Sequence, residues 1–195
     1  MIFTQQEFYF IRHGQTDWNL KHIAMGSKNI PLNQAGVEQA HEAKKLMHGY
    51  EFNSIVSSPL ERALQTAKIL NAEKPTRKIQ IIDELKEACW GEMEGKTKQS
   101  SDWINLWRNG SHINGAEKYT DFKKRVAKGL QKAMMCPGPV LIISHGGVYW
   151  AIQEMLNLVV CDLPNATPVY HRPPSDSGAN NQWFVCNLNY EESYE

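Results

Sequence analysis

The chain has 195 residues, and its 21 Lys and Arg balance 21 Asp and Glu, so the formal net charge is zero. This length suits one domain, 1–195, with a full hydrophobic core. The balanced charge argues against a broad surface for nucleic acid or a membrane, although a few local arginines suffice to bind one small anion.

The four cysteines, at positions 89, 136, 161 and 186, form neither a CxxC pair nor a zinc-ligand spacing. Free thiols in a reducing compartment are therefore expected. The N-terminal residues lack a basic start followed by a long apolar run, and no stretch has the length and apolarity of a membrane span. We expect a cytoplasmic protein; the pattern does not indicate an oligomeric state.

Strand and helix signals alternate along the first 82 residues. A short apolar run at 8–11 predicts a buried strand, and Asn33 is placed to cap a helix that runs to His48. A second buried strand is expected at 54–57. The sequence Ser-Pro-Leu-Glu at 58–61 predicts a capping box that opens a helix ending near Asn71. A further strand is expected at 78–82.

The second half repeats the alternation. Apolar residues recur at helical spacing over 117–134, which predicts an amphipathic helix. A strand is expected at 139–143, a helix after Gly147 to about Leu158, and a last strand at 183–188. Repeated strand–helix units predict an α/β fold with a mainly parallel sheet and helices on both faces.

Two stretches resist assignment. Residues 90–116 hold three tryptophans among Gly, Ser, Asn and Lys, and residues 161–182 are rich in Pro, Ser and Asn. We interpret both as loops that cover an active site; the alternative is surface connections whose tryptophans pack for structure. Tyr170 and His171 in the second stretch are candidates to reach the pocket.

Three polar motifs follow predicted strands. Arg12-His13-Gly14 comes directly after the first strand, Arg62 lies in the first turn of the helix after the second, and His145-Gly146-Gly147 follows a later one. In an open parallel sheet all three fall at the carboxyl edge, where ligands bind. Each motif is weak by itself, but three at one edge indicate a shared site.

Phosphoryl transfer explains this set of residue types. A neutral imidazole such as that of His13 can attack phosphorus and form a phosphohistidine. Two guanidiniums can bind the phosphoryl oxygens in fork geometry, and a second histidine can donate another hydrogen bond. Gly14 and Gly146 allow the backbone to approach a phosphate closely. The site is therefore expected to be an electrostatic cradle.

A carboxyl group is still needed, because the leaving alkoxide must gain a proton and the later water must lose one. Spacing does not choose between the candidates, and a solvated acidic face is the alternative. The candidates are Glu84, Glu87, Glu92 and Glu94.

The motifs together resemble the histidine phosphatase superfamily, also called the phosphoglycerate mutase-like family. RHGQTDWN at 12–19 is similar to the family's RHG-(E/Q)-(T/S)-x-W-N signature, and SSPLERA at 57–63 matches a second block. LKEACWGEMEG at 85–95 is similar to L-x-E-x-x-x-G-x-(W)-E-G, and SHGGV at 144–148 completes the set. The resemblance spans residues 8–150 in the right order.

The resemblance implies a three-layer αβα sandwich and neither a metal nor an organic cofactor. It makes His13 the phosphorylated nucleophile and Glu87 the proton donor and acceptor, acting on a small phosphorylated substrate. The residues that complete the phosphate pocket are then Arg12, Arg62 and His145. The positions that match substrate-pocket residues are Gln15, Asn19 and Gly26.

Departures from the family pattern favour a phosphatase over a mutase. Where the glycolytic mutases have E-R-x-Y, using Arg and Tyr to hold phosphoglycerate, this chain has Glu87-Ala88-Cys89-Trp90. Lys98 does match a mutase lysine. Met93, Asn29 and Asn33 replace a usual Trp, Asp and Thr, none of them a phosphate ligand. The alternatives are a bisphosphoglycerate-dependent phosphoglycerate mutase and a non-catalytic phospho-ligand binding module.

Overall fold

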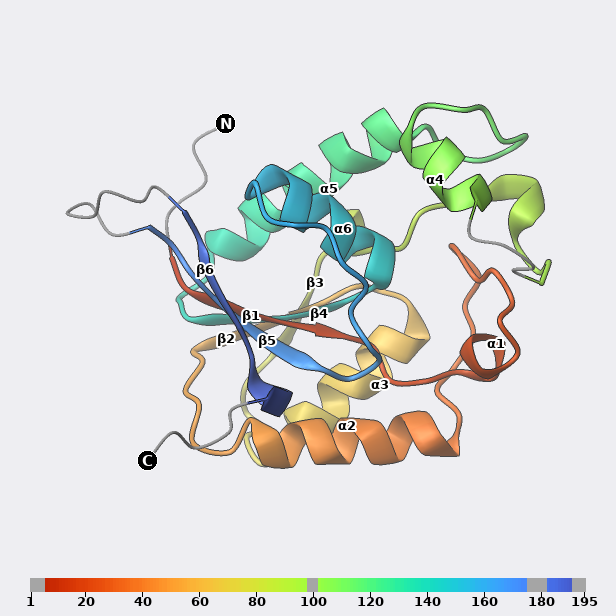
Figure 1. Ribbon diagram of the computed structural model, residues 1–195. Helices are drawn as coiled ribbons and strands as arrows, with labels where there is room; N and C mark the ends of the chain where they lie inside the picture. The colour runs from red at the N-terminus through yellow and green to blue at the C-terminus, as the bar shows by residue number, and fades with distance from the viewer. Residues whose placement is uncertain (1–5, 98–101, 175–181, 191–195) are drawn as a thin grey trace.

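The computed structural model describes residues 6–97, 102–174 and 182–190 (Figure 1). Its centre is a six-stranded sheet in the order β3-β2-β4-β1-β5-β6. The strands are β1 Phe8–Arg12, β2 Ser54–Ser57, β3 Ile79–Ile81, β4 Val140–Ser144, β5 Pro168–Arg172 and β6 Phe184–Asn187. The helices are α1 Asp17–Leu20, α2 Gln34–Leu46, α3 Glu61–Leu70, α4 Asp102–Arg108, α5 Tyr119–Met134 and α6 Gly146–Met155. Single 3-10 turns are η1 Asp83–Leu85, η2 Gly91–Met93 and η3 Leu188–Tyr190.

The central strands are apolar on both faces because helices cover both sides of the sheet. All five residues of β4 are buried, as a strand in the middle of a parallel sheet requires. Phe8 and Phe10 of β1 belong to one apolar cluster, whereas Tyr9 and Ile11 belong to the other. The side chains of β1 therefore alternate between two cores.

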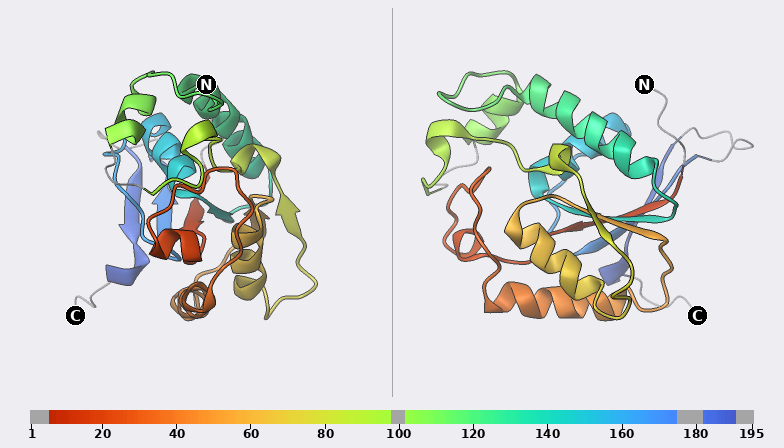
Figure 2. Two further views of the ribbon diagram at one scale, coloured as in Figure 1. Left: turned by 90° about the vertical axis from the view of Figure 1, so that its right-hand side faces the viewer. Right: turned by 180° about the vertical axis from the view of Figure 1, so that it is seen from behind.

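Helices α2 and α3 form one outer layer, and α5 and α6 form the other (Figure 1). Ala43, Ala63 and Ala67 bring α2 and α3 close to the core that contains Ile11. On the other face, Phe122 of α5 belongs to the core that contains Phe8 and Phe10. The views from the side and from behind show α2 and α3 packed next to each other below the sheet (Figure 2). This is the expected three-layer αβα sandwich.

The sheet is mixed rather than wholly parallel. β1, β2, β3 and β4 pair in parallel, while β5 pairs antiparallel with both β1 and β6. β5 lies within 161–182, so the prediction of a loop was wrong for residues 168–172. Tyr170 packs against Tyr9 and His171 stacks on Phe8, so neither belongs to the pocket at the carboxyl edge.

Two other expectations need correction. The stretch 90–116 contains η2 and α4, with Trp107 buried against Tyr119 and Phe122. The capping box at 58–61 is absent: α3 begins at Glu61, and its N-cap Leu60 has no side-chain hydrogen bond to offer. Residues 98–101 and 175–181 lie outside the described residues, and Lys98 is among them.

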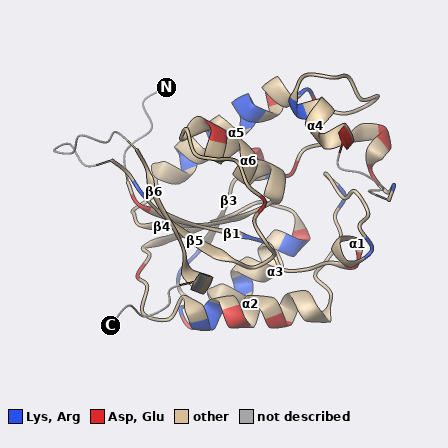
Figure 3. Cartoon of the chain, in the orientation of Figure 1, with Lys and Arg blue, Asp and Glu red and all other residues tan. Residues whose placement is uncertain are grey.

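No helix among the described residues is long and apolar enough to cross a membrane. Positive and negative side chains are interspersed along the helices, for example along α2 and α5 (Figure 3).

Candidate active site

The carboxyl ends of β1, β2 and β4 meet at one edge of the sheet, next to the loop that leads into α1 (Figure 2, left). Register places Arg12 beside Ser144, and Ser57 beside Ile143. His13, Ser58 and His145 each follow directly on one of these strand ends. The structure therefore brings together the three motifs that the sequence places after its strands.

His13 is held with its hydrogen on Nδ1 and its lone pair on Nε2. The ring is 3% exposed, and its Nδ1 lies 2.7 Å from the carbonyl oxygen of Gly14. A carbonyl only accepts, so Nδ1 carries the hydrogen and Nε2 carries the lone pair. Consistent with this tautomer, Nε of Arg62 donates to Nε2 of His13 at 3.2 Å.

The electrostatics keep His13 neutral. Burial lowers its pKa well below the ordinary value, and the charges of Arg62 and Arg12 lower it further, against a smaller opposing effect of the Gly14 hydrogen bond. A neutral imidazole is the form that has a nucleophilic lone pair.

Arg62 is fixed at all three guanidinium nitrogens. Besides the contact with His13, its Nη1 donates to the Lys28 carbonyl at 2.7 Å and its Nη2 to the Gly26 carbonyl at 2.9 Å. Gly26 has a φ of +53°, and a Cβ there would lie 2.9 Å from the Ala88 carbonyl oxygen. Gly26 thus acts on the site through Arg62. Burial lowers the pKa of Arg62 to about 10, so it remains a cation at neutral pH.

Arg12 is anchored at one end and unpaired at the other. Its Nη1 donates to the Leu163 carbonyl at 2.7 Å, while its buried Nε has no hydrogen-bond partner among the described residues. A Cβ at Gly146 would lie 3.7 Å from this Nε, so glycine keeps the space beside it open. An unpaired buried N–H is costly, and an anion would satisfy it.

His145 is completely buried, with its ring centre 5.2 Å from that of His13. Its Nε2 lies 2.7 Å from the hydroxyl of Ser58, while its Nδ1 has no partner in the described part of the chain. Burial and the charge of Arg62 hold its pKa well below the ordinary value. The Ser58 hydroxyl also accepts from the Leu60 N–H, whereas the Glu61 N–H that it was predicted to cap donates to Asn29 Oδ1 at 2.7 Å.

Of the four candidate carboxylates, only Glu87 is buried within this cluster. It is 7% exposed, and its oxygens accept hydrogen bonds from the N–H groups of Ala88 at 2.9 Å and Gly147 at 3.0 Å. Its charge raises the pKa values of both Arg12 and Arg62, in opposition to burial. Glu94 instead accepts hydrogen bonds from Ser27 and from the Trp90 N–H.

The remaining two candidates point elsewhere: Glu84 pairs with Lys132, and Glu92 is exposed.

Arg125 is a positioning residue that sequence reasoning did not find. Its Nη1 donates to the carbonyls of Glu84 and Lys86, both at 2.9 Å, and its Nη2 pairs with Glu117 at 2.6 Å. It therefore fixes the backbone immediately before Glu87. Arg125 occupies one turn of an amphipathic helix, and nothing in its spacing distinguishes it from a solvated arginine.

The expected substrate-pocket residues Gln15 and Asn19 have local partners. Oε1 of Gln15 accepts from Asn33 Nδ2 at 3.0 Å, and Asn19 forms a capping box with Thr16 at the start of α1. A role of either residue in binding substrate therefore stays a prediction.

A cavity of about 460 Å³ adjoins the cluster. It shares Arg12, Glu87, Gly146 and Gly147 with the site, and its other wall comes from α4, α6 and the segment that precedes Leu163. The residues that make this wall are Trp90, Ile104, Asn105, Arg108, Trp150, Val160, Cys161 and Asp162.

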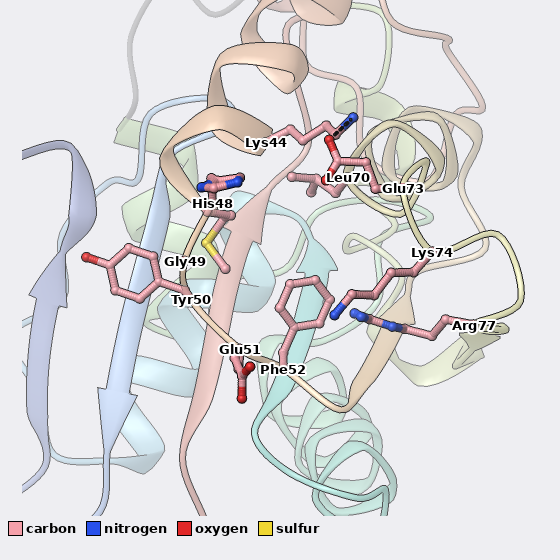
Figure 4. A pocket seen from close by; sticks show the side chains of 11 residues that line it. Lys44, His48, Gly49, Tyr50, Glu51, Phe52, Leu70, Glu73, Lys74 and Arg77 are labelled. Atoms are coloured by element: carbon pink, nitrogen blue, oxygen red, sulfur yellow. Dashed lines mark ion pairs between the residues drawn. The ribbon is translucent and has the colours of Figure 1, made fainter.

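A second cavity, of about 270 Å³, lies at the far edge of the sheet, where α2 and α3 end (Figure 4). Two of its cations have contacts within the protein: Lys44 pairs with Glu73 at 2.9 Å, and the Arg77 guanidinium lies 4.3 Å from the Phe52 ring centre. It shares no residue with the His13 cluster, so the carboxyl edge remains the candidate active site.

Among the described residues, no group of three or more His, Cys, Asp or Glu side chains could hold a metal ion.

Comparison with known proteins agrees with this geometry. An uncharacterized phosphatase PhoE of Bacillus subtilis is 37% identical over 149 residues, which cover 73% of this chain and 72% of that protein. An adenosylcobalamin/alpha-ribazole phosphatase of Escherichia coli is 31% identical over 151 residues, 72% of this chain and 73% of that protein. A 2,3-bisphosphoglycerate-dependent phosphoglycerate mutase of Haemophilus ducreyi is 34% identical, but over 52% of this chain and 49% of its own length.

The fold is shared with solved structures. The alpha-ribazole phosphatase of Shigella flexneri superposes with a TM-score of 0.77 at 24% identity, covering 94% of this chain and 96% of that one. The profile of the histidine phosphatase superfamily (branch 1) matches residues 8–165, which include every residue of the His13 cluster. This chain therefore belongs to the histidine phosphatase superfamily.

Proposed function

We propose that this protein hydrolyses phosphomonoesters of small metabolites through a phosphohistidine on His13, with Glu87 as the proton donor and acceptor. The observation that carries the proposal is the pair of contacts at His13. The Gly14 carbonyl holds Nδ1–H, which leaves the lone pair on Nε2 beside the guanidinium of Arg62. A bound phosphate at this guanidinium would lie within reach of that lone pair.

In the first step Nε2 of His13 forms a bond to phosphorus, and the bond from phosphorus to the ester oxygen breaks. Protonated Glu87 gives its proton to the departing alkoxide. In the second step the Glu87 carboxylate takes a proton from water as the water oxygen attacks phosphorus. The P–N bond then breaks, which returns neutral His13 and releases inorganic phosphate.

Arg12, Arg62 and His145 stabilise the charge on the transferred group. The unpaired Nε of Arg12 and the unpaired Nδ1 of His145 are the buried groups that gain most from a phosphoryl oxygen. Both guanidiniums are fixed by backbone carbonyls before substrate binds, so little reorganisation is needed.

Hydrolysis is favoured over the mutase reaction by the residues after Glu87. Ala88, Cys89 and Trp90 occupy the positions that would otherwise supply an arginine and a tyrosine for phosphoglycerate. The relatives matched at 37% and 31% identity carry phosphatase names, whereas a probable phosphoglycerate mutase of Yersinia pestis, matched over 69% of its length, is 29% identical.

We also propose that residues 1–195 form one domain and that 90–116 and 161–182 flank the substrate, because both contribute to the cavity beside Arg12. None of the four cysteines forms a disulfide, which suits the reducing cytoplasm expected from the sequence. The proposed partner is a small phosphorylated substrate rather than nucleic acid or a membrane.

The test is hydrolysis of p-nitrophenyl phosphate in chelator-treated buffer by His13→Ala, with the exposed His41→Ala as the matched control. We expect His13→Ala to lose about 10³-fold or more in kcat, because it lacks the nucleophile. The control should match the unsubstituted protein. Undiminished turnover by His13→Ala would refute the nucleophile.

Incubation with 3-phosphoglycerate and a trace of 2,3-bisphosphoglycerate separates the alternatives. Free phosphate is the expected product, and conversion to the 2-isomer would identify a mutase instead. Tight phosphate binding without turnover of any ester would identify a binding module.

A further inference from the structure

The cavity beside Arg12 is where the alcohol part of a substrate has to lie. Arg12 and Glu87 belong both to the His13 cluster and to the cavity wall. A phosphate bound at the cluster, with its ester oxygen toward Glu87, directs the rest of the molecule into this space. Its volume of about 460 Å³ falls in the range of small-molecule sites.

Aromatic side chains form rigid parts of the wall. Trp90 is buried and meets Trp103 edge to face, with ring centres 5.2 Å apart at 80°. Trp150 is half-buried, and its Nε1 donates to Asp162 Oδ1 at 2.9 Å, which fixes the orientation of its ring. The aliphatic Ile104 and Val160 complete the apolar part of the wall. Fixed aromatic surfaces of this kind favour a flat ring system over a flexible chain.

The charged groups of the wall are neutralised by partners. Arg108 lies 5.6 Å from the centre of the Trp150 ring and pairs with Glu154 at 2.9 Å. Glu154 is held in turn by the hydroxyl of Tyr119 at 2.6 Å and by Lys123 at 3.0 Å. Since Arg108 is already paired, a substrate carboxylate entering here would have to compete with Glu154.

Asp162 adds negative charge to the mouth of the cavity, where it acts on Arg12. Four of the described wall residues are charged: Arg12, Arg108, Glu87 and Asp162. Each arginine has a carboxylate near it. A second anionic group on the substrate would therefore add little favourable binding free energy in this cavity.

We propose that the substrate is a phosphate ester whose alcohol part carries a flat ring and no second anionic group, with Trp150 selecting the ring and Glu154 excluding a carboxylate by occupying Arg108. This inference rests on the proposed phosphatase function. Trp150 acts by contact with substrate, whereas Glu154 acts through Arg108 and is a positioning residue.

Three esters of similar alcohol acidity test the proposal: benzyl phosphate, cyclohexylmethyl phosphate and 4-carboxybenzyl phosphate. We expect kcat/KM to be highest for benzyl phosphate, by up to about tenfold over the cyclohexyl ester. The carboxybenzyl ester should be the poorest, with the loss in KM rather than in kcat. Equal kcat/KM values for the three esters would overturn the proposal.

Two variants test which residues cause the preference among the three esters. Trp150→Leu should remove most of the preference for benzyl over cyclohexylmethyl phosphate. Glu154→Gln should free Arg108 and raise kcat/KM for the carboxybenzyl ester relative to the benzyl ester by about tenfold. Lys123→Met is the matched control, because it removes another partner of Glu154 and leaves the Arg108–Glu154 pair in place; its ratio should not change.

The ratio of the kcat/KM values for two substrates, measured on one protein sample, does not depend on the fraction of the variant that is folded. Unchanged ratios in both Trp150→Leu and Glu154→Gln would overturn the inference while hydrolysis itself continues. Failure to hydrolyse any of the three esters, with isomerisation of 3-phosphoglycerate, would instead overturn the proposed function.

Discussion

At the scale of single residues, Glu87 is held in one orientation by backbone. Two N–H groups, from Ala88 and Gly147, each hydrogen-bond one of its oxygens. A Cβ on Gly147 would lie 2.4 Å from Glu87 Oε1, so a side chain at that position would displace the carboxylate. In the proposed mechanism, this fixed carboxyl donates the proton on which the departure of a poor leaving group depends.

Glu87→Gln keeps the size of the side chain and removes its exchangeable proton. We expect kcat/KM to fall by about 10² to 10⁴-fold for alkyl phosphates, which need protonation of the alkoxide. The loss should be smaller for p-nitrophenyl phosphate, whose leaving group departs as a stable anion. Steady-state kinetics with the two substrates measure this difference.

The exposed Glu92→Gln is the matched control, and we expect it to have the kinetics of the unsubstituted protein. A loss of the same size on alkyl and aryl esters in Glu87→Gln would count against a proton donor in the first step.

Ser58 is placed to select the tautomer of His145. Its hydroxyl accepts from the Leu60 N–H at 3.3 Å and lies 2.7 Å from His145 Nε2. A hydroxyl that accepts from a backbone N–H can donate its own hydrogen to Nε2, which leaves Nδ1 of His145 as an N–H donor for a phosphoryl oxygen.

Ser58→Ala should therefore lower kcat by up to about tenfold, which is the rate factor that corresponds to the loss of one hydrogen bond near the site. Thr66→Ser is the comparison, since it keeps the hydroxyl that accepts from the Gly14 N–H. A kcat for Ser58→Ala equal to that of the unsubstituted protein would contradict the assigned tautomer.

At the scale of elements, the strand ends were the most predictable part of the site. Buried strands are continuous apolar runs, and Arg12, Ser58 and His145 follow directly on such runs, so the sequence places them at one edge. The carboxylate was not predictable in this way. Glu87 follows a 3-10 turn rather than a strand. From the sequence, only the family resemblance distinguished it from the other three glutamates; in the structure, its burial and hydrogen bonds do.

The features that were missed have separate physical causes. β5 lies between stretches rich in proline and pairs antiparallel with β1 and β6, so it is not part of the alternation of strands and helices. α4 has seven residues, too short for a clear helical period. The prediction of a capping box was wrong because the Glu61 N–H donates to the side chain of Asn29, 32 residues earlier, rather than to the Ser58 hydroxyl.

Arg125 couples α5 to the loop that carries Glu87. It donates to the carbonyls of Glu84 and Lys86, so its removal should make that loop more mobile. Arg125 itself is not expected to contact substrate. We expect Arg125→Gln to lose more activity on alkyl phosphates than on p-nitrophenyl phosphate, in the same direction as Glu87→Gln but more weakly.

Lys124→Gln provides the control on the same helix, because Lys124 is exposed and pairs only loosely with Asp121 at 3.8 Å. An equal loss on both substrates in Arg125→Gln would indicate a general effect on stability rather than positioning of Glu87.

At the scale of the whole molecule, three histidines are enclosed by the sheet and its two helical layers. His13 and His145 lie at the carboxyl edge, and His171 of β5 is stacked on Phe8 at 4.3 Å with the Tyr149 hydroxyl 3.2 Å from its Nε2. Burial lowers the pKa of His171 to about 3. Each of these rings is therefore neutral in the folded protein at pH 6.

This enclosure predicts a loss of stability in acid. Above about pH 6.5 the three rings are neutral in both the folded and the unfolded chain. Below that pH the unfolded chain takes up three protons that the folded protein does not, so the free energy of unfolding falls as the pH falls. Each histidine contributes about 1.4 kcal/mol per pH unit, and the loss continues until the pH reaches the lowered pKa of the folded state.

Urea unfolding between pH 7 and pH 4.5 measures this slope. His171→Phe preserves a ring against Phe8 and removes one of the three protons, so its slope below pH 6 should be smaller by about 1.4 kcal/mol per pH unit. His41→Gln, at an exposed position on α2, should keep the slope of the unsubstituted protein. If His171→Phe and the unsubstituted protein lose stability at the same rate in acid, His171 is not neutral in the folded state.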